Sequence, residues 1–308
     1  MLFFLVFRPV ARKAGIGQVS CRTPGSARGR HAESVAQDAI ENDLDLTERE
    51  QEEAEERSSV NVRVVHEAVR REGEEELERS SQALAWSGLA AGLSMGFSFI
   101  AEGLLRSHIP DAPWRPLVVK LGYSAGFVLV ILGRQQLFTE NTLTPILPLL
   151  HRKNLQTLLQ VLRLWVVVLI ANLLGALVIA WVLGNTGAFQ PEVRQTFSDI
   201  AHESANVTFG LALLRGVFAG WLIAFMVWLL PFAESARVAV IVGITWLVGV
   251  GQFTHIIAGS VDVLFLVMTG ALPFSHYLGG YMIPTLLGNI LGGVSLVAAL
   301  NHAQVVSE

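Results

Sequence analysis

The chain has 308 residues, 52% of them hydrophobic and 16% charged, with a formal net charge of −4 at pH 7. Residues 1–80 hold 29 of the 48 charged side chains, and no Lys or Arg follows Arg237. The rest of the chain is therefore depleted of charge, which a membrane domain requires and a soluble core does not. The single cysteine, Cys21, excludes an intramolecular disulfide framework and a cysteine-based metal site.

The N-terminal part of the chain is expected to lie outside the membrane. Residues 1–61 are charged and predicted to be disordered, unless residues 1–35 reflect an upstream start. Residues 62–80 carry apolar side chains at roughly helical spacing, which predicts a cytosolic helix ending near the membrane. A membrane domain is predicted over 81–303, followed by a short C-terminal tail over 304–308.

The apolar stretches of the membrane domain have two lengths. A spanning helix needs about 20 apolar residues, and four stretches fit one span each: about 84–105, 158–183, 209–230 and 281–300. Two others are too long for one span and carry polar interruptions: about 116–150, interrupted at 133–142, and about 236–272, interrupted at 251–259. The economical interpretation of each long stretch is a half-helix, a non-helical loop and a second half-helix.

Internal similarity predicts that the membrane domain has two related halves. Three pairs of segments are similar: 136–139 with 251–254 at an offset of 115, 171–176 with 288–293 at an offset of 117 and, more weakly, 88–92 with 216–220. Each half then has three spans, and this odd number forces the halves to lie inverted in the bilayer with both breaks near the midplane. The predicted fold is an all-α membrane protein of six spans in two inverted three-helix repeats, with broken second and fifth helices.

The paired breaks point to a permeation or binding site, because interrupted helices at matching positions are the best sequence signal of one. His255 lies in the second break, where an imidazole can hold or share a proton near physiological pH. Thr139 and Thr254 are expected to fix its tautomer by hydrogen bonding. The alternative is a histidine that only satisfies carbonyl groups freed by the helix break.

Other polar residues of the apolar segments have predicted structural roles. Asn172 and Asn289 are expected to bond backbone groups across helices and to hold the two halves together. Asp262 is expected to cap the half-helix after the second break, with a role as proton acceptor as the alternative. For three ionisable side chains we prefer structural pairing, across the protomer or at its interface, to a role in transport: Arg134, Glu140 and Arg215.

Three motifs resemble those of the formate/nitrite transporter family. Phe253–Gly259 is similar to the family's Phe-Glu-His-Ser-Ile-Ala-Asn, and Leu137–Thr139 matches its Leu-Phe-Thr. Ile283–Gly293 matches its closing motif Ile-Pro-x-x-x-Gly-Asn-Ile-x-Gly-Gly. The resemblance covers roughly residues 62–303, and the combination of the three motifs in register makes it specific.

The resemblance implies a homopentamer of aquaporin-like protomers in a bacterial inner membrane, each with a pore for small monovalent anions such as formate, nitrite or acetate. His255 would be the central proton-sharing group, and hydrophobic constrictions would flank it. The implied pore-lining residues are His255, Thr139, Phe138, Thr254, Phe253, Tyr123, Phe127 and Val248. No cofactor, metal or nucleic acid is implied. A modest excess of Lys and Arg on one side predicts that both termini are cytoplasmic.

The sequence departs from the family at four pore positions. Thr254 stands in place of a glutamate, Gly259 and Gly220 in place of asparagines, and Ser204 in place of a vestibule lysine. This thinner polar lining keeps two alternatives open, a channel for neutral solutes and a non-conducting structural pentamer. The chain contains no Asn-Pro dipeptide of the aquaporin type, and no HExxH, Walker A or cysteine motif that would indicate an enzyme.

Overall fold

The computed structural model describes residues 61–307, and this part is helical with no strand. The segment predicted to be disordered lies outside the described residues, apart from Asn61, which caps the first described helix. The described residues belong to one compact unit, Val60–Glu308. They confirm the predicted all-α class.

The first half of the membrane domain consists of two long helices around a broken one. The long helices α4 and α8 pack along each other, and α6 packs against α4. The break over residues 133–145 confirms the predicted interruption of the second apolar stretch. The helices of this half are α4 (Ser81–His108), α5 (Arg115–Val119), α6 (Ser124–Leu132), the short η1 (Glu140–Thr142), α7 (Ile146–Arg152) and α8 (Leu155–Asn185).

The second half repeats this plan and adds one helix that the sequence analysis did not predict. That helix, α9, is too polar to span a bilayer, and it buries Phe197 and Ile200 against α4 and α12. The elements are α9 (Pro191–Ala205), α10 (Phe209–Leu229), η2 (Leu230–Phe232), η3 (Glu234–Ala236), α11 (Arg237–Val250), α12 (Ala258–Met268), α13 (Phe274–His276), η4 (Tyr277–Met282), α14 (Ile283–Leu291), η5 (Gly292–Ala299) and α15 (Leu300–Ser307).

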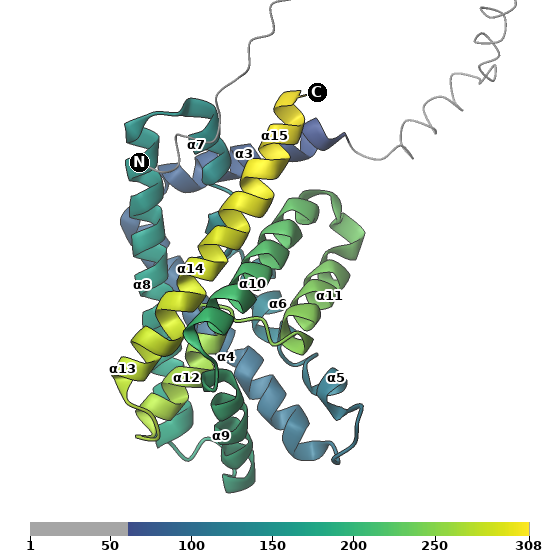
Figure 1. Cartoon of the computed structure of the whole chain (residues 1–308), viewed down its shortest axis with the longest axis vertical. Helices are drawn as coiled ribbons and strands as arrows, with labels where there is room; N and C mark the ends of the chain where they lie inside the picture. Colours follow the sequence, from purple (N-terminus) through teal and green to yellow (C-terminus); the bar gives the residue numbers. More distant parts are fainter. Residues whose placement is uncertain (1–60, 308) are drawn as a thin grey trace, which may run out of the picture. The chain divides into compact units, whose positions relative to one another are not determined.

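Five helical segments of the described part are long and apolar enough to cross a membrane: Ser81–His108, Arg115–Leu132, Leu155–Asn185, Phe209–Phe232 and Phe274–Val305. The remaining predicted span is divided between α11 and the short apolar helix α12 by the second break. The last span is a single curved path in Figure 1, in which α13, α14 and α15 are joined by the π-helical segments η4 and η5.

The two breaks have the same backbone conformation. Each follows a glycine that ends a half-helix, and the next residue has a positive φ, 49° at Arg134 and 51° at Gln252. The N–H of Gln135 then bonds the carbonyl of Val130 at 2.9 Å, and that of Phe253 bonds the carbonyl of Val248 at 3.0 Å. These equivalent residues are 118 positions apart. The predicted offset of 115 at the breaks is therefore wrong, because it matched side chains rather than this left-handed hook.

A buried asparagine binds each break to the helices of its own half. Asn172 accepts the N–H of Phe138 at 2.9 Å and donates to the carbonyls of Gly88 and Gln136 at 2.7 and 2.9 Å. Asn289 makes the equivalent bonds, accepting from Ile256 and donating to Gly216 and Thr254, all at 2.9 Å. The expectation that these asparagines join the two halves is wrong, since all their hydrogen bonds stay within one half.

The helix α3 (Val62–Glu78) lies at the end of the bundle where α7 and α15 also end (Figure 1). It contacts α7 and α8 of the first half and α10 and α15 of the second. The closest approach is at Gly73, where a Cβ atom would lie 2.0 Å from the carbonyl oxygen of Thr144. Only glycine allows α3 to pack directly against the first break.

Candidate functional site

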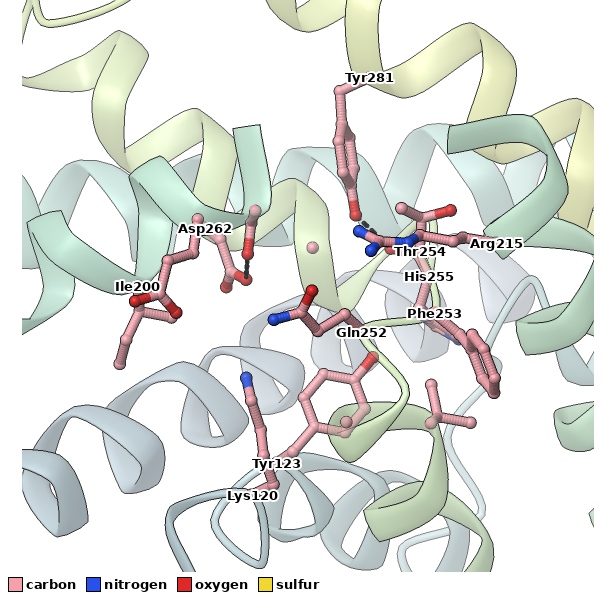
Figure 2. Close-up of a pocket in the computed structure, with 15 residues that line it drawn as sticks. Lys120, Tyr123, Ile200, Arg215, Gln252, Phe253, Thr254, His255, Asp262 and Tyr281 are labelled. Carbon is pink, nitrogen blue, oxygen red and sulfur yellow. Dashed lines mark hydrogen bonds between the residues drawn. The ribbon is translucent and has the colours of Figure 1, made fainter. Parts of the chain in front are cut away.

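A small cavity of about 60 Å³ lies beside the second break. It is lined by residues of α9, α10, α11 and α12, by the turn before α6 and by η4, so both halves contribute (Figure 2). A cavity of this size holds a few water molecules or one small anion. Of the sequence-predicted residues, the lining includes Tyr123, Val248, Phe253, Thr254 and His255.

His255 is 1% exposed and both of its ring nitrogens are engaged. Nδ1 accepts backbone N–H groups of Ile257 and Ala258 at 3.3 and 3.1 Å, at the start of α12. Because Nδ1 is an acceptor, the proton of the neutral ring lies on Nε2. Nε2–H then donates to Oγ1 of Thr139, 2.8 Å away across the two breaks. The first amides of α12 thus set the tautomer, and the hydroxyl from the other half accepts the remaining ring N–H.

Aromatic and aliphatic side chains surround the imidazole. The ring of Phe127 stands edge-on to it, with centroids 5.0 Å apart and an interplanar angle of 77°. Tyr123 packs on Phe127 one turn earlier, at a centroid distance of 5.3 Å. Val248 is fully buried and lines the same cavity. Of the apolar residues that the resemblance assigned to constrictions, Phe127 contacts the imidazole, and Tyr123 and Val248 line the cavity together with His255.

Three residues predicted to lie in the pore make further contacts, and two of them also line the cavity: Thr254 and Phe253. The hydroxyl of Thr254 donates to the carbonyl of Ala212 at 2.6 Å, so the expectation that it fixes the histidine tautomer is wrong. Phe138 is not part of the cavity lining and packs edge-on to Trp165, with centroids 5.8 Å apart. Phe253 lines the cavity and packs on Phe218.

The cavity also has a charged lining that sequence reasoning largely missed. Nζ of Lys120 lies 2.6 Å from a carboxylate oxygen of Glu102. Asp262 accepts the hydroxyl of Ser204 at 2.8 Å. Asp262 does not cap α12 as expected, because it lies in the second turn of that helix, whose N-cap Ile257 makes no side-chain bond. The only sequence signal for this cluster was the presence of ionisable residues in apolar stretches.

Pairing within the protomer was one of two structural roles expected of three ionisable residues, and no such ion pair is present within residues 61–307. No ion pair there includes Arg134, Glu140 or Arg215. A role at the protomer interface stays a prediction. One carboxylate oxygen of Glu140 is buried without a hydrogen-bond partner in the described part. Arg215, which the sequence analysis assigned mainly to pairing, instead lines the cavity (Figure 2).

The two glycines at asparagine positions of the family have different surroundings. At Gly259 a Cβ atom would lie 1.7 Å from the hydroxyl oxygen of Tyr281, so this tyrosine fills the space that a side chain would need. At Gly220 a Cβ atom would lie 2.2 Å from the backbone oxygen of Asn289. Gly220 therefore allows α10 and α14 to pack closely. It is not part of the cavity lining, although the resemblance predicted a pore position there.

Most of the chain matches one known protein family. A family model described as formate/nitrite transporter matches residues 63–303. The chain belongs to the formate/nitrite transporter family. It is 42% identical over 244 residues to the inner membrane protein YfdC of Escherichia coli K12, and this alignment covers 79% of each of the two chains. It is 26% identical to the formate channel BtFdhC of Bacillus thuringiensis, over 73% of this chain and 88% of that protein.

Solved structures of this family have the same fold. A pentameric formate channel with formate bound superposes with a TM-score of 0.64 at 22% identity, over 74% of this chain and 98% of that one. An ion channel of the family superposes with a TM-score of 0.65 at 17% identity, over 79% and 98%. The predicted aquaporin-like fold of two inverted repeats is thereby confirmed.

Family membership defines the broad function of the chain. Members of the formate/nitrite transporter family are membrane channels and transporters, so the chain is not an enzyme. Its relatives among the formate channels support an anion channel. Its apolar helices and the inner-membrane protein YfdC among its relatives support a place in a membrane.

Proposed function

We propose that the chain conducts small monovalent anions such as formate, nitrite or acetate, through one pore in each protomer of a homopentamer. Support comes from the formate channels among its relatives and from the pentameric formate channel that shares its fold. The observation that carries the proposal is the bond between Nε2 of His255 and Oγ1 of Thr139. This bond supports a proton-sharing role for His255, which lies next to a cavity of about 60 Å³.

The proposed passage relies on compensating for lost hydration. A bare anion in hydrocarbon has a desolvation cost on the order of tens of kcal/mol in idealised terms. The positive end of the α12 half-helix dipole and the Nε2–H of His255 can replace part of that stabilisation. Tyr123, Phe127 and Val248 would form the narrow apolar segments on either side. Full protonation of the ring requires Nδ1 to leave the amides of the α12 start, so the resting role of His255 is to share a hydrogen bond.

We further propose the arrangement of the chain in a bacterial inner membrane. Residues 1–61 and the helix at 62–80 would lie in the cytoplasm, the channel would occupy 81–303, and the tail 304–308 would return to the cytoplasm. The excess of Lys and Arg on the side that includes Arg152, Lys153 and Arg237 supports this orientation. No cofactor or nucleic acid takes part in the proposed function.

Two other functions follow from the reduced polarity of the lining. The glycine at position 259 and the threonine at 254, both in the cavity lining, favour a neutral-solute channel or a non-conducting pentamer. Proteoliposomes loaded with the purified protein separate the three possibilities in one experiment. Uptake of formate, nitrite and acetate without glycerol supports the anion channel. Glycerol uptake supports the neutral-solute channel, and no uptake of any of these supports the structural pentamer.

Replacing His255 by Phe tests its role directly. We expect formate flux to fall at least about tenfold, because the pore loses the hydrogen bond that His255 would make to a charged solute. The measurement is formate uptake into proteoliposomes at equal protein content. His276→Phe is the matched control, because His276 is exposed and outside the cavity lining. Wild-type flux in His255→Phe would remove His255 from the proposed mechanism.

A further inference from the structure

Arg215 has an unusual position for a charged residue. It is the only charged side chain in α10, whose other residues are apolar or small. Ionisable side chains inside transmembrane helices are rare and mark substrate or ion pathways. Arg215 lines the cavity beside the second break together with Thr254, His255 and Tyr281. In Figure 2 its guanidinium extends toward the hydroxyl end of Tyr281, next to the segment that carries His255.

The other charged side chains around the cavity already have an ion-pair or hydrogen-bond partner in the protein. Lys120 is paired with Glu102 at 2.6 Å. Glu203 is paired with Arg106 at 2.8 Å. Asp262 accepts a hydroxyl hydrogen bond from Ser204, on the opposite side of the cavity from Arg215 in Figure 2.

Arg215 differs from these residues. Within residues 61–307 no carboxylate lies within ion-pair distance of it. Its guanidinium is therefore the cation of this cavity that lacks a protein counter-ion in the described part. Ser204 supplies a hydroxyl to Asp262 and no positive charge. An anion that enters the cavity finds its electrostatic partner at Arg215.

We infer that Arg215 holds the permeating anion beside His255 and selects planar oxyanions over spherical halides. A guanidinium presents its donors in a flat fork that matches the two oxygens of a carboxylate or of nitrite, whereas a halide has no such geometry. Formate, nitrite and acetate share this two-oxygen edge. The inference rests on the proposed anion channel and names the residue that would set its selectivity.

The test compares two variants of Arg215 in proteoliposomes. Arg215→Gln removes the charge, and we expect the formate concentration for half-maximal flux to rise about tenfold or more, with a smaller change in maximal flux. Arg215→Lys keeps the charge but loses the fork. We expect half-maximal formate flux within about threefold of wild type, and a preference for formate over chloride reduced about tenfold. Competition of chloride with labelled formate measures this preference.

Arg152→Gln is the matched control, because it removes one arginine charge from α7, away from the cavity, where Arg152 pairs with Glu74 at 2.7 Å. We expect both half-saturation and chloride competition to stay at wild-type values. Size-exclusion chromatography shows which variants assemble. If Arg215→Gln fails to assemble, the formate preference of Arg215→Lys alone tests the inference.

Several outcomes would overturn the inference. Unchanged half-saturation in Arg215→Gln, or unchanged formate preference in Arg215→Lys, removes Arg215 from anion selection. A loss of maximal flux alone, in either variant, indicates a structural role and also overturns it. Absence of anion flux in the wild-type protein is a different result, because it contradicts the proposed channel itself.

Discussion

At the scale of single residues, the surroundings of His255 depend on a close contact between Gly259 and Tyr281. Gly259 leaves room for the hydroxyl of Tyr281, which donates to the carbonyl of His255 at 3.3 Å. The family's asparagine at that position and this tyrosine cannot occupy the same space. The polar group lost at position 259 is thus replaced by one that comes from η4, 22 residues later in the chain.

Gly259→Asn should destabilise the protein because its Cβ would lie 1.7 Å from the Tyr281 oxygen. Overpacking of this kind costs about 1–3 kcal/mol. Tyr281→Ala removes the ring that the new side chain would meet. In the double variant, the loss of unfolding free energy should therefore differ from the sum of the two single losses by at least about 1 kcal/mol. The measurement is the thermal unfolding midpoint of the two single variants and the double variant. Additive effects would contradict the contact.

Gly210→Asn is the control for this comparison. A Cβ atom at Gly210 would meet nothing within 4 Å, and the residue is exposed. We expect it to leave the unfolding midpoint close to that of the wild type. A shift as large as that of Gly259→Asn would show that the substitution type, and not the contact with Tyr281, causes the loss.

At the scale of elements, each half is organised by one asparagine that joins two helices and a break. A break in a membrane helix frees backbone groups that lipid cannot satisfy. Asn289 satisfies one N–H and two carbonyls of its half. Asn172 does the same in the other half, which is why the two breaks have the same shape despite different side chains.

Asn289→Leu should leave the N–H of Ile256 and the carbonyl of Thr254 without partners, at about 1–3 kcal/mol for each buried group. We expect a lower thermal unfolding midpoint and loss of assembled protein on size-exclusion chromatography. Asn185→Leu is the control, because Asn185 is exposed and bonds carbonyls at a helix end. If Asn289→Leu were as stable as the wild type, Asn289 would not hold the second break to its neighbouring helices as described.

The helix α3 is coupled to the first break through a buried carboxyl group. The hydroxyl of Thr144 and, at 3.2 Å, the amide of Gln136 donate to Glu76. Burial raises the pKa of Glu76 to about 7, from an ordinary value of 4.5, and the neighbouring charge of Glu72 adds to this rise. Hydrogen bonds from Thr144 and Gln136 and the charge of Arg79 act in the opposite direction.

This raised pKa makes the docking of α3 dependent on pH. Between pH 4.5 and about 7 the docked helix holds a proton that the undocked helix has lost, so docking weakens as pH rises through this window and changes no further above it. We expect faster hydrogen exchange of α3 amides at pH 8 than at pH 5, after correction for intrinsic exchange. Glu76→Gln should abolish the difference, and Glu75→Gln, at an exposed position, should keep it. A pH-independent exchange in the wild type would contradict this coupling.

At the scale of the whole molecule, the inverted repeat places the site between two halves that each supply part of it. Thr139 comes from the first break and His255 from the second. The lining adds α9 and α10 of the second half to the turn before α6 of the first. A three-span half alone would therefore lack the proton-sharing pair.

The proposed orientation can be tested with single cysteines in a Cys21→Ser background. With the N-terminus in the cytoplasm, residue 111 lies outside and residue 153 inside. We expect Asp111→Cys to react with a membrane-impermeant maleimide in intact cells, because Asp111 is 92% exposed. Lys153→Cys should react only after permeabilisation. The opposite labelling pattern would show that the orientation is reversed.

The sequence by itself determined the number of spans, the two breaks, their inverted relation and the family. These features depend on local quantities, since the length of an apolar stretch and a polar interruption within it are read without knowing any contact. The left-handed hook at each break was not readable, because it is a backbone conformation that Arg134 and Gln252 adopt with unlike side chains.

Only the tertiary structure decided which polar side chains meet. Thr139 and Thr254 have the same chemistry and similar sequence surroundings, yet one hydroxyl meets the imidazole and the other meets the carbonyl of Ala212. Arg215 is one ionisable residue in an apolar helix until the packing of α10 places it at the cavity. The reason is physical: the direction of a side chain within a bundle follows from helix contacts between residues far apart in the chain, and hydropathy contains no record of them.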